Sequence, residues 1–514
     1  MIHIRQAVSR TKRPLIFASV TSIGLSTYAL EQHTATTPAS EALSRQYDAD
    51  AIASYWSKRP LSVFGRVVDI LSESVPIAFR VAIDWDDALG RDEELQRRHA
   101  MDVKDALTRL GPAFVKAGQQ ISIRPDLVSP AVLKVLQTLC DAVEPVQNDI
   151  AMKILREELL KDKLDGDLDD IFVGGEDGLE LVASASLGQV YKGRIKVGEN
   201  EDQVAEVAIK VQRPDMVSRV SLDLFLLYKY AQLLDMFTST FTKQSPYHVD
   251  LIKNFAAGSY TELDYEREAS NQIRFKNELN DRKCLCVVPA VHQRFTTSRV
   301  ITTDWINGVK LVDAPNHQIQ ALIPVGVELF LTQLLDIGAF HADPHPGNLL
   351  VTENNELCLL DFGLIAEVEE QSQRAMTAAI VHLISGDFET LVSKDAKLLG
   401  FLPDDYDTQD LQPILTKVLA EGLLNSGSNL RTRKRKLMEI SNELNEIFFK
   451  YPFSVPPFFA LVTRGLGLLE GIALAGDPNF DIFKASYPYA RRRAIKLFGM
   501  NILKAGSGTN KSIS

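Results

Sequence analysis

The pattern of apolar and polar positions divides this chain into helical, strand-rich and again helical stretches. Apolar residues recur at three- and four-residue spacing through residues 50–105, which predicts amphipathic helices. Between 170 and 213 the pattern changes to short apolar runs separated by glycine-containing turns, which predicts strands. Residues 214–258 are long and amphipathic and predict one or two helices, and the chain after Gly363 is expected to be helical to about residue 500. This order predicts an α+β protein.

The stretch Gly338–Gly363 combines a hairpin pattern with polar residues. Strand signals at 349–352 and 357–362 flank the polar turn Glu353–Glu356, which predicts two antiparallel strands. Asp361 lies at the end of the second strand signal and is followed by phenylalanine and glycine. The sequence therefore predicts that the hairpin brings Asp361 close to the residues that precede it.

Three residues of this stretch have the types that phosphoryl transfer requires. Asp343 precedes Asn348 by five positions, and Asp361 follows the hairpin. One aspartate can accept or orient the acceptor proton, while an asparagine and a second aspartate hold divalent metal on the phosphates. The alternative is an ordinary polar loop beside a hairpin. The combined spacing favours a nucleotide and metal site, because an isolated Asp-Phe-Gly is common by chance.

A second group of residues lies in the strand-rich stretch. The octapeptide ASASLGQV at 183–190 has the spacing of the glycine-rich phosphate loop of kinases, with Ala183 and Ala185 in the first two glycine places and Gly188 retained. Lys210 follows in the tetrapeptide VAIK, where a strand lysine can reach the α and β phosphates. Each motif is weak alone, and together they predict a small nucleotide-binding lobe.

Four acidic residues are expected at a helix start, at 262, 264, 266 and 268. One acid on this helix, Glu268 or Glu262, is expected to pair with Lys210, as kinases require. The alternative is a solvated acidic first turn that the helix dipole favours.

Two helix residues and one strand connection are further candidates for the same site. Lys116 and Gln119 are three residues apart and project from one side of a predicted helix that bends near Gly111–Pro112, unless they are ordinary solvated helix residues. The segment 299–311 reads as a strand, a connection and a turn, and backbone groups from Asp304 to Ile306 are expected to bond an adenine edge.

Composition narrows the function classes. The chain has 514 residues, 45% of them hydrophobic, so two or three folded units are expected. Its net charge of −11 argues against general nucleic-acid binding. Its four cysteines form neither a zinc motif nor a disulfide framework; Cys284 and Cys286 are a possible redox pair or, more commonly, two half-buried strand residues. A reducing compartment fits this usage.

The N-terminal segment, a basic run and a late apolar stretch of the chain indicate the cellular compartment and membrane contacts to expect. Residues 1–30 are basic and free of acidic residues, which is typical of an organelle presequence, and the apolar run 15–30 is shorter than a membrane span. The basic run 431–436 reads as a solvated loop or a contact with anionic lipid. The stretch 452–476 contains an arginine and a glutamate and is predicted to be a core helix.

Taken together, these residues resemble the UbiB/ADCK (aarF-domain) family of atypical kinase-like proteins over roughly residues 50–495. The Lys-x-Gly-Gln motif matches 116–119, the alanine-rich loop matches 183–186, and the Glu-x-Asp motif matches 262–264. The catalytic loop matches 341–348. The segments 461–480 and 55–60 are similar to the plastid and cyanobacterial branch. The absence of Ala-Pro-Glu after Asp-Phe-Gly fits this family, in which the first and third motifs cover the peptide site.

The resemblance implies a two-lobed protein-kinase-like fold that uses ATP and Mg²⁺. It implies five segments, namely a presequence and linker (1–46), a helical extension (47–165), a small lobe with a helical insert (166–312), a mostly helical large lobe (313–500) and a tail (501–514). The implied catalytic residues are Asp343, Lys210, Glu268, Lys116, Gln119, Glu262 and Asp264. The implied nucleotide-binding residues are Ala183, Ser184, Ala185, Ser186, Gly188, Val190, Lys210, Asp304 and Ile306, and the implied metal ligands are Asn348 and Asp361.

The branch implies prenylquinone or other isoprenoid-lipid metabolism at an organelle membrane. Expected partners are ATP, prenyl lipids or quinone precursors, a membrane surface and quinone-biosynthesis proteins, with no nucleic acid. A chloroplast is favoured, with a mitochondrion as the alternative because the apolar run comes so early. ATP hydrolysis, lipid phosphorylation, protein phosphorylation and a non-catalytic scaffold role all remain open.

Overall fold

The computed structural model describes most of the chain and forms two compact units. The described residues are 43–84, 92–122, 129–140, 145–160, 167–197, 203–241, 248–342, 346–419, 456–477 and 480–499. The first unit comprises Met1–Arg267 and His292–Asp304, and the second comprises Glu268–Val291 and Trp305–Ser514. The presequence, Asp343, the basic run 431–436 and the tail therefore lie outside the described residues. The five predicted segments stay predictions.

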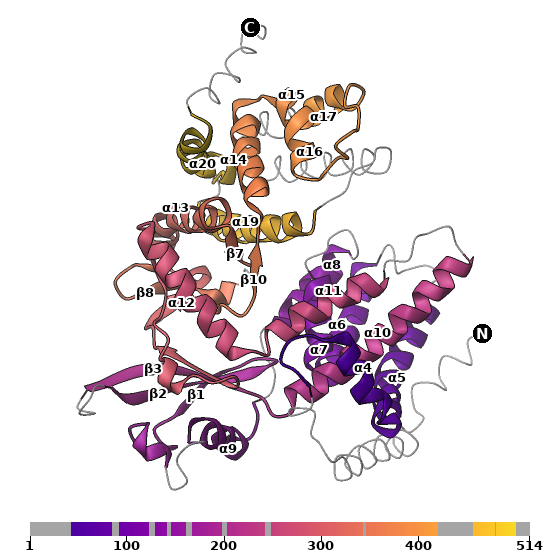
Figure 1. Ribbon diagram of the computed structural model, residues 1–514, viewed down its shortest axis with the longest axis vertical. Helices are drawn as coiled ribbons and strands as arrows, with labels where there is room; N and C mark the ends of the chain where they lie inside the picture. Colours follow the sequence, from indigo (N-terminus) through magenta and orange to yellow (C-terminus); the bar gives the residue numbers. More distant parts are fainter. Residues whose placement is uncertain are drawn as a thin grey trace. The chain divides into compact units, whose positions relative to one another are not determined.

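Helices and one sheet make up the first unit (Figure 1). Its helices are α4 (Ala49–Ser57), α5 (Pro60–Ile83), α6 (Glu93–Leu110), α7 (Pro112–Ile121), α8 (Pro130–Leu136), η2 (Gln137–Cys140), α9 (Asn148–Leu159), η3 (Leu168–Asp170), α10 (Met216–Phe241), α11 (His248–Thr261) and η4 (Gln293–Phe295). Its strands β1 (Glu180–Ser184), β2 (Gly188–Val197), β3 (Gln203–Gln212) and β5 (Val300–Asp304) pair antiparallel in the order β1-β2-β3-β5.

Two predictions about the helices of this unit are confirmed. The predicted bend occurs at Gly111, which has a φ of 104° and separates α6 from α7. The amphipathic stretch after the sheet forms two helices, α10 and α11, which run side by side (Figure 1). Their buried face packs with α4 around Trp56, Phe225 and Tyr260.

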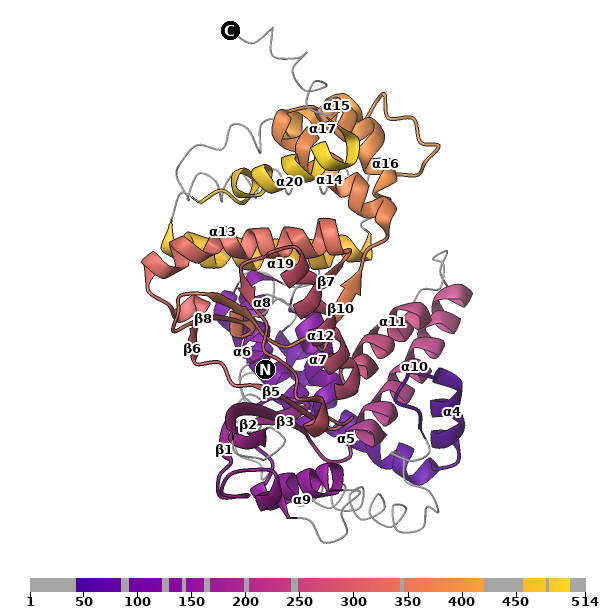
Figure 2. The same cartoon turned by 60° about the vertical axis from the view of Figure 1, so that its left-hand side comes forward.

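The second unit is mostly helical (Figure 2). Its helices are α12 (Tyr265–Asp281, which begins in the first unit), η5 (Leu311–Asp313), α13 (Asn316–Thr332), the π-helical turn η6 (Gln333–Ile337), η7 (Pro346–Asn348), α14 (Glu370–Ser385), α15 (Phe388–Thr390), the π-helical turn η8 (Leu391–Asp395), α16 (Ala396–Leu398), α17 (Gln412–Leu419), α19 (Pro457–Gly476) and α20 (Ile482–Phe498). Its strands are β4 (Cys286–Val287), β6 (Gly308–Lys310), β7 (Ala339–His341), β8 (Leu349–Thr352), β9 (Leu357–Leu359) and β10 (Ile365–Glu367).

The predicted hairpin forms, although its second strand is shorter than expected. β8 and β9 are antiparallel and belong to a sheet of order β4-β9-β8-β6, while β10 pairs with β7. β9 ends at Leu359 because Asp361 has a φ of 60°, which no strand residue adopts. The prediction of uninterrupted helix after Gly363 is wrong at β10, and the turn predicted near 308–310 is the strand β6.

The core of the second unit is built on α13 and α19, which lie side by side in Figure 2. Among the described helices, Asn316–Ile337 alone is long and apolar enough to cross a membrane, and 67% of its apolar window is buried, as in a core helix. The described part of the predicted core helix 452–476 is α19, which contributes Val462, Leu469 and Ile472 to this core.

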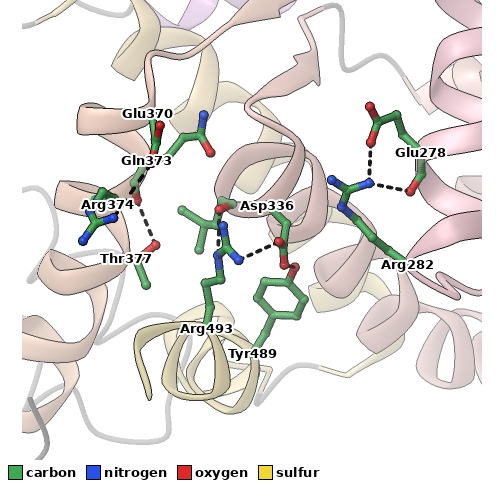
Figure 3. Close-up of polar contacts among 10 residues, drawn as sticks. Glu278, Arg282, Asp336, Glu370, Gln373, Arg374, Thr377, Tyr489 and Arg493 are labelled. Atoms are coloured by element: carbon green, nitrogen blue, oxygen red, sulfur yellow. Dashed lines mark hydrogen bonds and ion pairs between the residues drawn. The ribbon is translucent and has the colours of Figure 1, made fainter. Parts of the chain in front are cut away.

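Helix α20 contacts the turn that leads into the stretch Gly338–Gly363 (Figure 3). Arg493 Nη1 lies 2.7 Å from Asp336 Oδ1 in η6, and the Tyr489 hydroxyl donates to Asp336 Oδ2 at 3.0 Å. Burial raises the pKa of Tyr489, which keeps this hydroxyl protonated as a donor. Because η6 runs directly into β7, these contacts fix where β7 begins.

Candidate functional site

The second unit positions Asn348 and Asp361 next to each other through backbone contacts. The Leu360 N–H donates to the Asn348 carbonyl at 2.9 Å, which joins the residue before the hairpin to the residue before Asp361. Asp361 Oδ1 in turn accepts the Gly363 N–H at 3.1 Å. The main chain at Asn348 is thus joined to the residue that precedes Asp361 at the open end of the hairpin. Amide and carboxylate oxygens suit Mg²⁺, which takes its other ligands from phosphates and water.

His341 supports the backbone of this turn from β7. It is 5% exposed, and its Nε2 contacts the carbonyl oxygens of Asp361 and, at 3.2 Å, Leu360. Its ring meets the Phe362 ring edge-on, with centroids 5.9 Å apart. His341 therefore contacts the turn that carries Asp361 through the main chain.

Helix α12 contacts the same turn from its other side. Asn271 Nδ2 donates to the Phe362 carbonyl at 3.0 Å, and the Phe275 ring lies 5.5 Å from the Phe362 ring. The rings of Phe275, Phe362 and His341 form one buried aromatic cluster. The sequence interpretation missed Asn271 and Phe275, although their positions, three and seven after Glu268, are those of one helix face.

Glu268 is buried beside Gly363. It is 4% exposed, and a Cβ added at Gly363 would lie 3.5 Å from Glu268 Oε2 and 3.2 Å from Asp361 Oδ1. Gly363 thus lets two carboxylates approach the same short stretch of main chain. Glu268 is buried and Asp361 is exposed. Because a buried carboxylate is retained where a cation pairs with it, the position of Glu268 fits pairing with a lysine or a metal.

The first unit holds the alanine-rich loop in a tight hairpin turn. Ala183 pairs with Val190 and Ser184 with Gln189 across β1 and β2, and the Ala185 N–H donates to the Gly188 carbonyl at 2.8 Å. A Cβ at Gly188 would come within 2.5 Å of the Tyr265 hydroxyl, so glycine is required there. Ser186 lies within this turn.

Arg213 ties this loop to the end of β3. Its Nε donates to the Ala185 carbonyl and its Nη2 to Ser184 Oγ, both at 2.9 Å, while its own N–H donates to the Leu187 carbonyl at 2.9 Å. Burial lowers the pKa of Arg213, and the nearby Arg219 acts in the same direction. The sequence interpretation missed this residue. The available signal was its position three residues after Lys210.

Lys210 lies in the centre of this sheet. It pairs with Val190 on β2 and Ile301 on β5, and its Nζ lies 5.1 Å from the centroid of the Tyr265 ring. Glu268 follows Tyr265 by three positions on α12. Lys210 belongs to the first unit and Glu268 to the second, so their ion pair stays a prediction.

The predicted Lys-x-Gly-Gln motif and the predicted Glu-x-Asp motif meet. Lys116 on α7 forms an ion pair with Glu262, and their side chains are only 15% and 17% exposed. Gln119 lies on the same helix, one turn further on. Gln212, the last residue of β3, donates from Nε2 to the Leu263 carbonyl at 2.9 Å. This hydrogen bond attaches the turn that contains Glu262 to the end of β3.

The expected acidic helix start is split. α11 ends at Thr261 and α12 begins at Tyr265, so Glu262 lies in the turn between them and not on a helix. Asp264 Oδ1 accepts the Arg267 N–H at 3.2 Å, which caps α12. Only the acids at 266 and 268 lie on the helix itself.

The remaining candidates are placed separately. Asp304 ends β5, and its Oδ1 lies 2.9 Å from His292 Nε2, while Ile306 follows in the connection to β6. Asp343 lies outside the described residues. Within the described ranges no group of three His, Cys, Asp or Glu side chains is arranged to hold a metal. Asn348 and Asp361 remain predicted metal ligands.

The three cysteines whose side chains are described form no disulfide and are expected to be poorly reactive. Cys286 lies on β4, Cys284 precedes it, and Cys358 lies on the neighbouring β9. Burial raises the pKa of Cys284 to about 11 and that of Cys358 to about 12. These thiols remain protonated at neutral pH, which disfavours the redox alternative.

Comparison with known proteins identifies the family of this chain. The ABC1 atypical kinase-like domain model matches residues 139–394. The uncharacterized Synechocystis protein slr1919 is 35% identical over 461 residues, covering 88% of this chain and 76% of that protein. The chain belongs to the ABC1 (aarF) family of atypical kinase-like proteins. Its fold is accordingly the α+β kinase-like fold.

Other members of the ABC1 family are longer than this chain. Protein ACTIVITY OF BC1 COMPLEX KINASE 3, chloroplastic, from Arabidopsis thaliana is 35% identical over 454 residues, covering 87% of this chain and 60% of that protein. The uncharacterized Synechocystis protein sll0005 is 35% identical over 456 residues, and the chain spans 63% of its length. The relatives fit the plastid and cyanobacterial branch.

A solved structure supports the fold alone. The Rv3197–erythromycin complex from Mycobacterium tuberculosis superposes with a TM-score of 0.50, over 75% of this chain and 93% of that one, at 18% identity.

Proposed function

We propose that this chain is an ATP- and Mg²⁺-dependent atypical kinase-like enzyme, an ATPase or phosphotransferase. The observation that carries the proposal is the turn after β9, where Asp361 and Asn348 adjoin and His341, Asn271 and Phe275 hold the main chain. In this role Asn348 and Asp361 hold the metal on the phosphates, where it offsets their developing negative charge.

The other residues have complementary roles in this proposal. Lys210 contacts the α and β phosphates and is oriented by Glu268, while the loop 183–190 covers them and backbone groups from Asp304 to Ile306 contact the adenine. Asp343 positions the acceptor hydroxyl or water.

The acceptor is proposed to be water or a lipid-related molecule. The ion pair between Lys116 and Glu262 supports this proposal, because both side chains are largely buried and bind each other. Gln119 and Asp264, which neighbour that pair, are proposed to complete a cover over the acceptor side. A cover of this kind leaves little access for a peptide, which disfavours a protein kinase.

The proposed setting is prenylquinone or other isoprenoid-lipid metabolism at an organelle membrane. A plastid is favoured because curated relatives from Arabidopsis thaliana are named as chloroplastic and others come from a cyanobacterium. The early apolar run keeps a mitochondrion as the alternative.

Phosphate release from ATP and Mg²⁺ by the purified chain tests this proposal. We expect release that a lipid vesicle containing a quinone-precursor mimic stimulates, and that Asp361→Asn abolishes. A phosphorylated lipid without free phosphate would instead identify a lipid kinase. Absence of both products would contradict the enzymatic proposal.

The competing function is a nucleotide-binding scaffold for a quinone-synthesis assembly. The presence of Lys210, Glu268, Asn348 and Asp361 disfavours it, because a scaffold has no need of a complete phosphoryl-transfer set. If an Asp343→Asn chain fully rescued a null strain, catalysis by Asp343 would be excluded and the scaffold preferred.

A further inference from the structure

Helix α5 presents its apolar side to the outside of the first unit. Six large apolar side chains along it are each 51–66% exposed. They are Leu61, Phe64, Leu71, Val75, Phe79 and Ile83. With Val68 between them, their spacing of three or four residues places them on one face. We call this face the α5 stripe.

The charged side chains of α5 point the other way. The helix has four, and all of them make ion pairs, three of them with neighbouring helices. Arg66 pairs with Asp223 on α10 at 2.6 Å, and Arg80 with Asp102 on α6 at 3.1 Å. This helix is therefore inverted relative to an ordinary surface helix, which buries its apolar face.

The α5 stripe also offers almost no hydrogen-bonding groups. The hydroxyls of the neighbouring Ser72 and Ser74 donate to carbonyls within the helix, those of Asp69 at 2.8 Å and Ile70 at 2.7 Å. Protein interfaces normally have a polar rim and about ten hydrogen bonds. An uncharged surface without free donors is better matched by acyl chains than by a second protein surface.

The chain that leads into this part of the first unit has matching chemistry. Residues 1–30 include four basic residues and no acidic ones, and they contain the apolar run 15–30. That segment leads to Leu43, which packs with Trp56 of α4 in the core beside α5. Basic residues favour anionic headgroups, while the α5 stripe suits the acyl boundary below them.

We propose that the α5 stripe is a lipid-docking surface that lies in the plane of a membrane interface. The helix has 24 residues and is about 36 Å long. It is long enough to span a membrane, but its composition does not qualify it as a spanning helix. This inference rests on the proposed role at a membrane and is independent of the phosphoryl chemistry.

Flotation of the full chain with phosphatidylcholine vesicles at high salt tests this proposal, because salt screens attraction by the basic segment. We expect the double variant Phe64→Glu/Phe79→Glu to bind at least about tenfold less than the unaltered chain, since each phenylalanine loses its apolar burial. The milder pair Leu71→Ser/Val75→Ser should bind weakly as well. The control is Leu285→Glu, an apolar residue of the second unit that is 77% exposed, and its binding should not change.

Two outcomes would overturn this assignment. One is vesicle binding by the double variant equal to that of the unaltered chain. The other is a chain that ignores vesicles and forms a dimer that Phe64→Glu/Phe79→Glu dissociates, which would make the occupant a second copy. Phosphate release without vesicles should be equal in all variants, so failure of the enzymatic proposal is measured separately.

Discussion

At the scale of single residues, Arg213 takes over the positioning that glycine provides in ordinary phosphate loops. Alanine restricts the backbone of the loop, and a guanidinium with two side-chain donors then holds the resulting turn. In the proposed function, the shape that this loop presents to the phosphates is therefore set by a residue outside the loop.

Replacing Arg213 with glutamine should weaken nucleotide binding more than it slows turnover. The variant loses two hydrogen bonds to the loop, each contributing about 0.5–1.5 kcal/mol, which corresponds to roughly a tenfold rise in KM for ATP. The control is Arg194→Gln on β2, an exposed residue away from the loop turn. A fall in kcat with an unchanged KM would assign Arg213 another role.

Lys116→Ala tests the cover proposed for the acceptor side. Removing the lysine leaves the largely buried Glu262 carboxylate without this cation, so the turn before α12 should shift and change nucleotide affinity or autophosphorylation several-fold. Lys153→Ala is a matched control, because Lys153 pairs with Glu157 on an exposed helix face. If neither property changed in Lys116→Ala, the covering role would be excluded.

At the scale of elements, the hairpin and the sheet could be predicted from the sequence, but their ends could not. Strand alternation and a polar turn encode β8 and β9, and the same signals place Lys210 on a strand. The early end of β9 depends on the backbone of Asp361, and the division between α11 and α12 depends on a cap by Asp264. The contacts of Arg213, Asn271 and Phe275 join residues distant in sequence, which local periodicity does not report.

The ion pair of Arg66 with the buried Asp223 should be essential for the helical part of the first unit. Asp223 is 1% exposed, so Arg66→Met would leave its buried carboxylate without the cation that bonds it directly, at a cost of about 3–5 kcal/mol. The exposed pair of Arg109 with Glu73 provides the control, and Arg109→Met should change stability by only about 0–1 kcal/mol. Urea unfolding measures both, and equal effects of the two substitutions would contradict this interpretation.

At the scale of the whole molecule, the kinase-like fold and the family could be predicted because several motifs agree along the chain. Lys116, Lys210, Glu262 and Asp361 each resemble one family motif, and their order and spacing are specific together. The sequence predicted the pairing of Lys116 with Glu262 only through the family resemblance. The exposed apolar side of α5 could not be predicted, because its spacing is also that of an ordinary core-facing helix.

Nucleotide and metal should stabilise the folded chain together. A ligand that binds only the folded state at 100 times its Kd adds about 2.7 kcal/mol, so ATP with Mg²⁺ should raise the Tm measurably. Chelation of the metal, or the variant Asp361→Asn, should remove the Mg²⁺-dependent part of that rise. A Tm that responds to ATP but never to Mg²⁺ would contradict metal binding by Asn348 and Asp361.

The left-handed backbone of Asp361 has an evolutionary consequence. In the proposed function this position supplies a carboxylate, and it also adopts a φ of 60°. Among the residues that adopt this conformation most readily, glycine, asparagine and aspartate, only aspartate is charged. Asparagine keeps the backbone and loses the charge, whereas glutamate keeps the charge and costs about 1–2 kcal/mol in this conformation. No single substitution preserves both properties, so every replacement of Asp361 is expected to reduce function. A lineage that loses this aspartate can regain full function only by mutating back to aspartate.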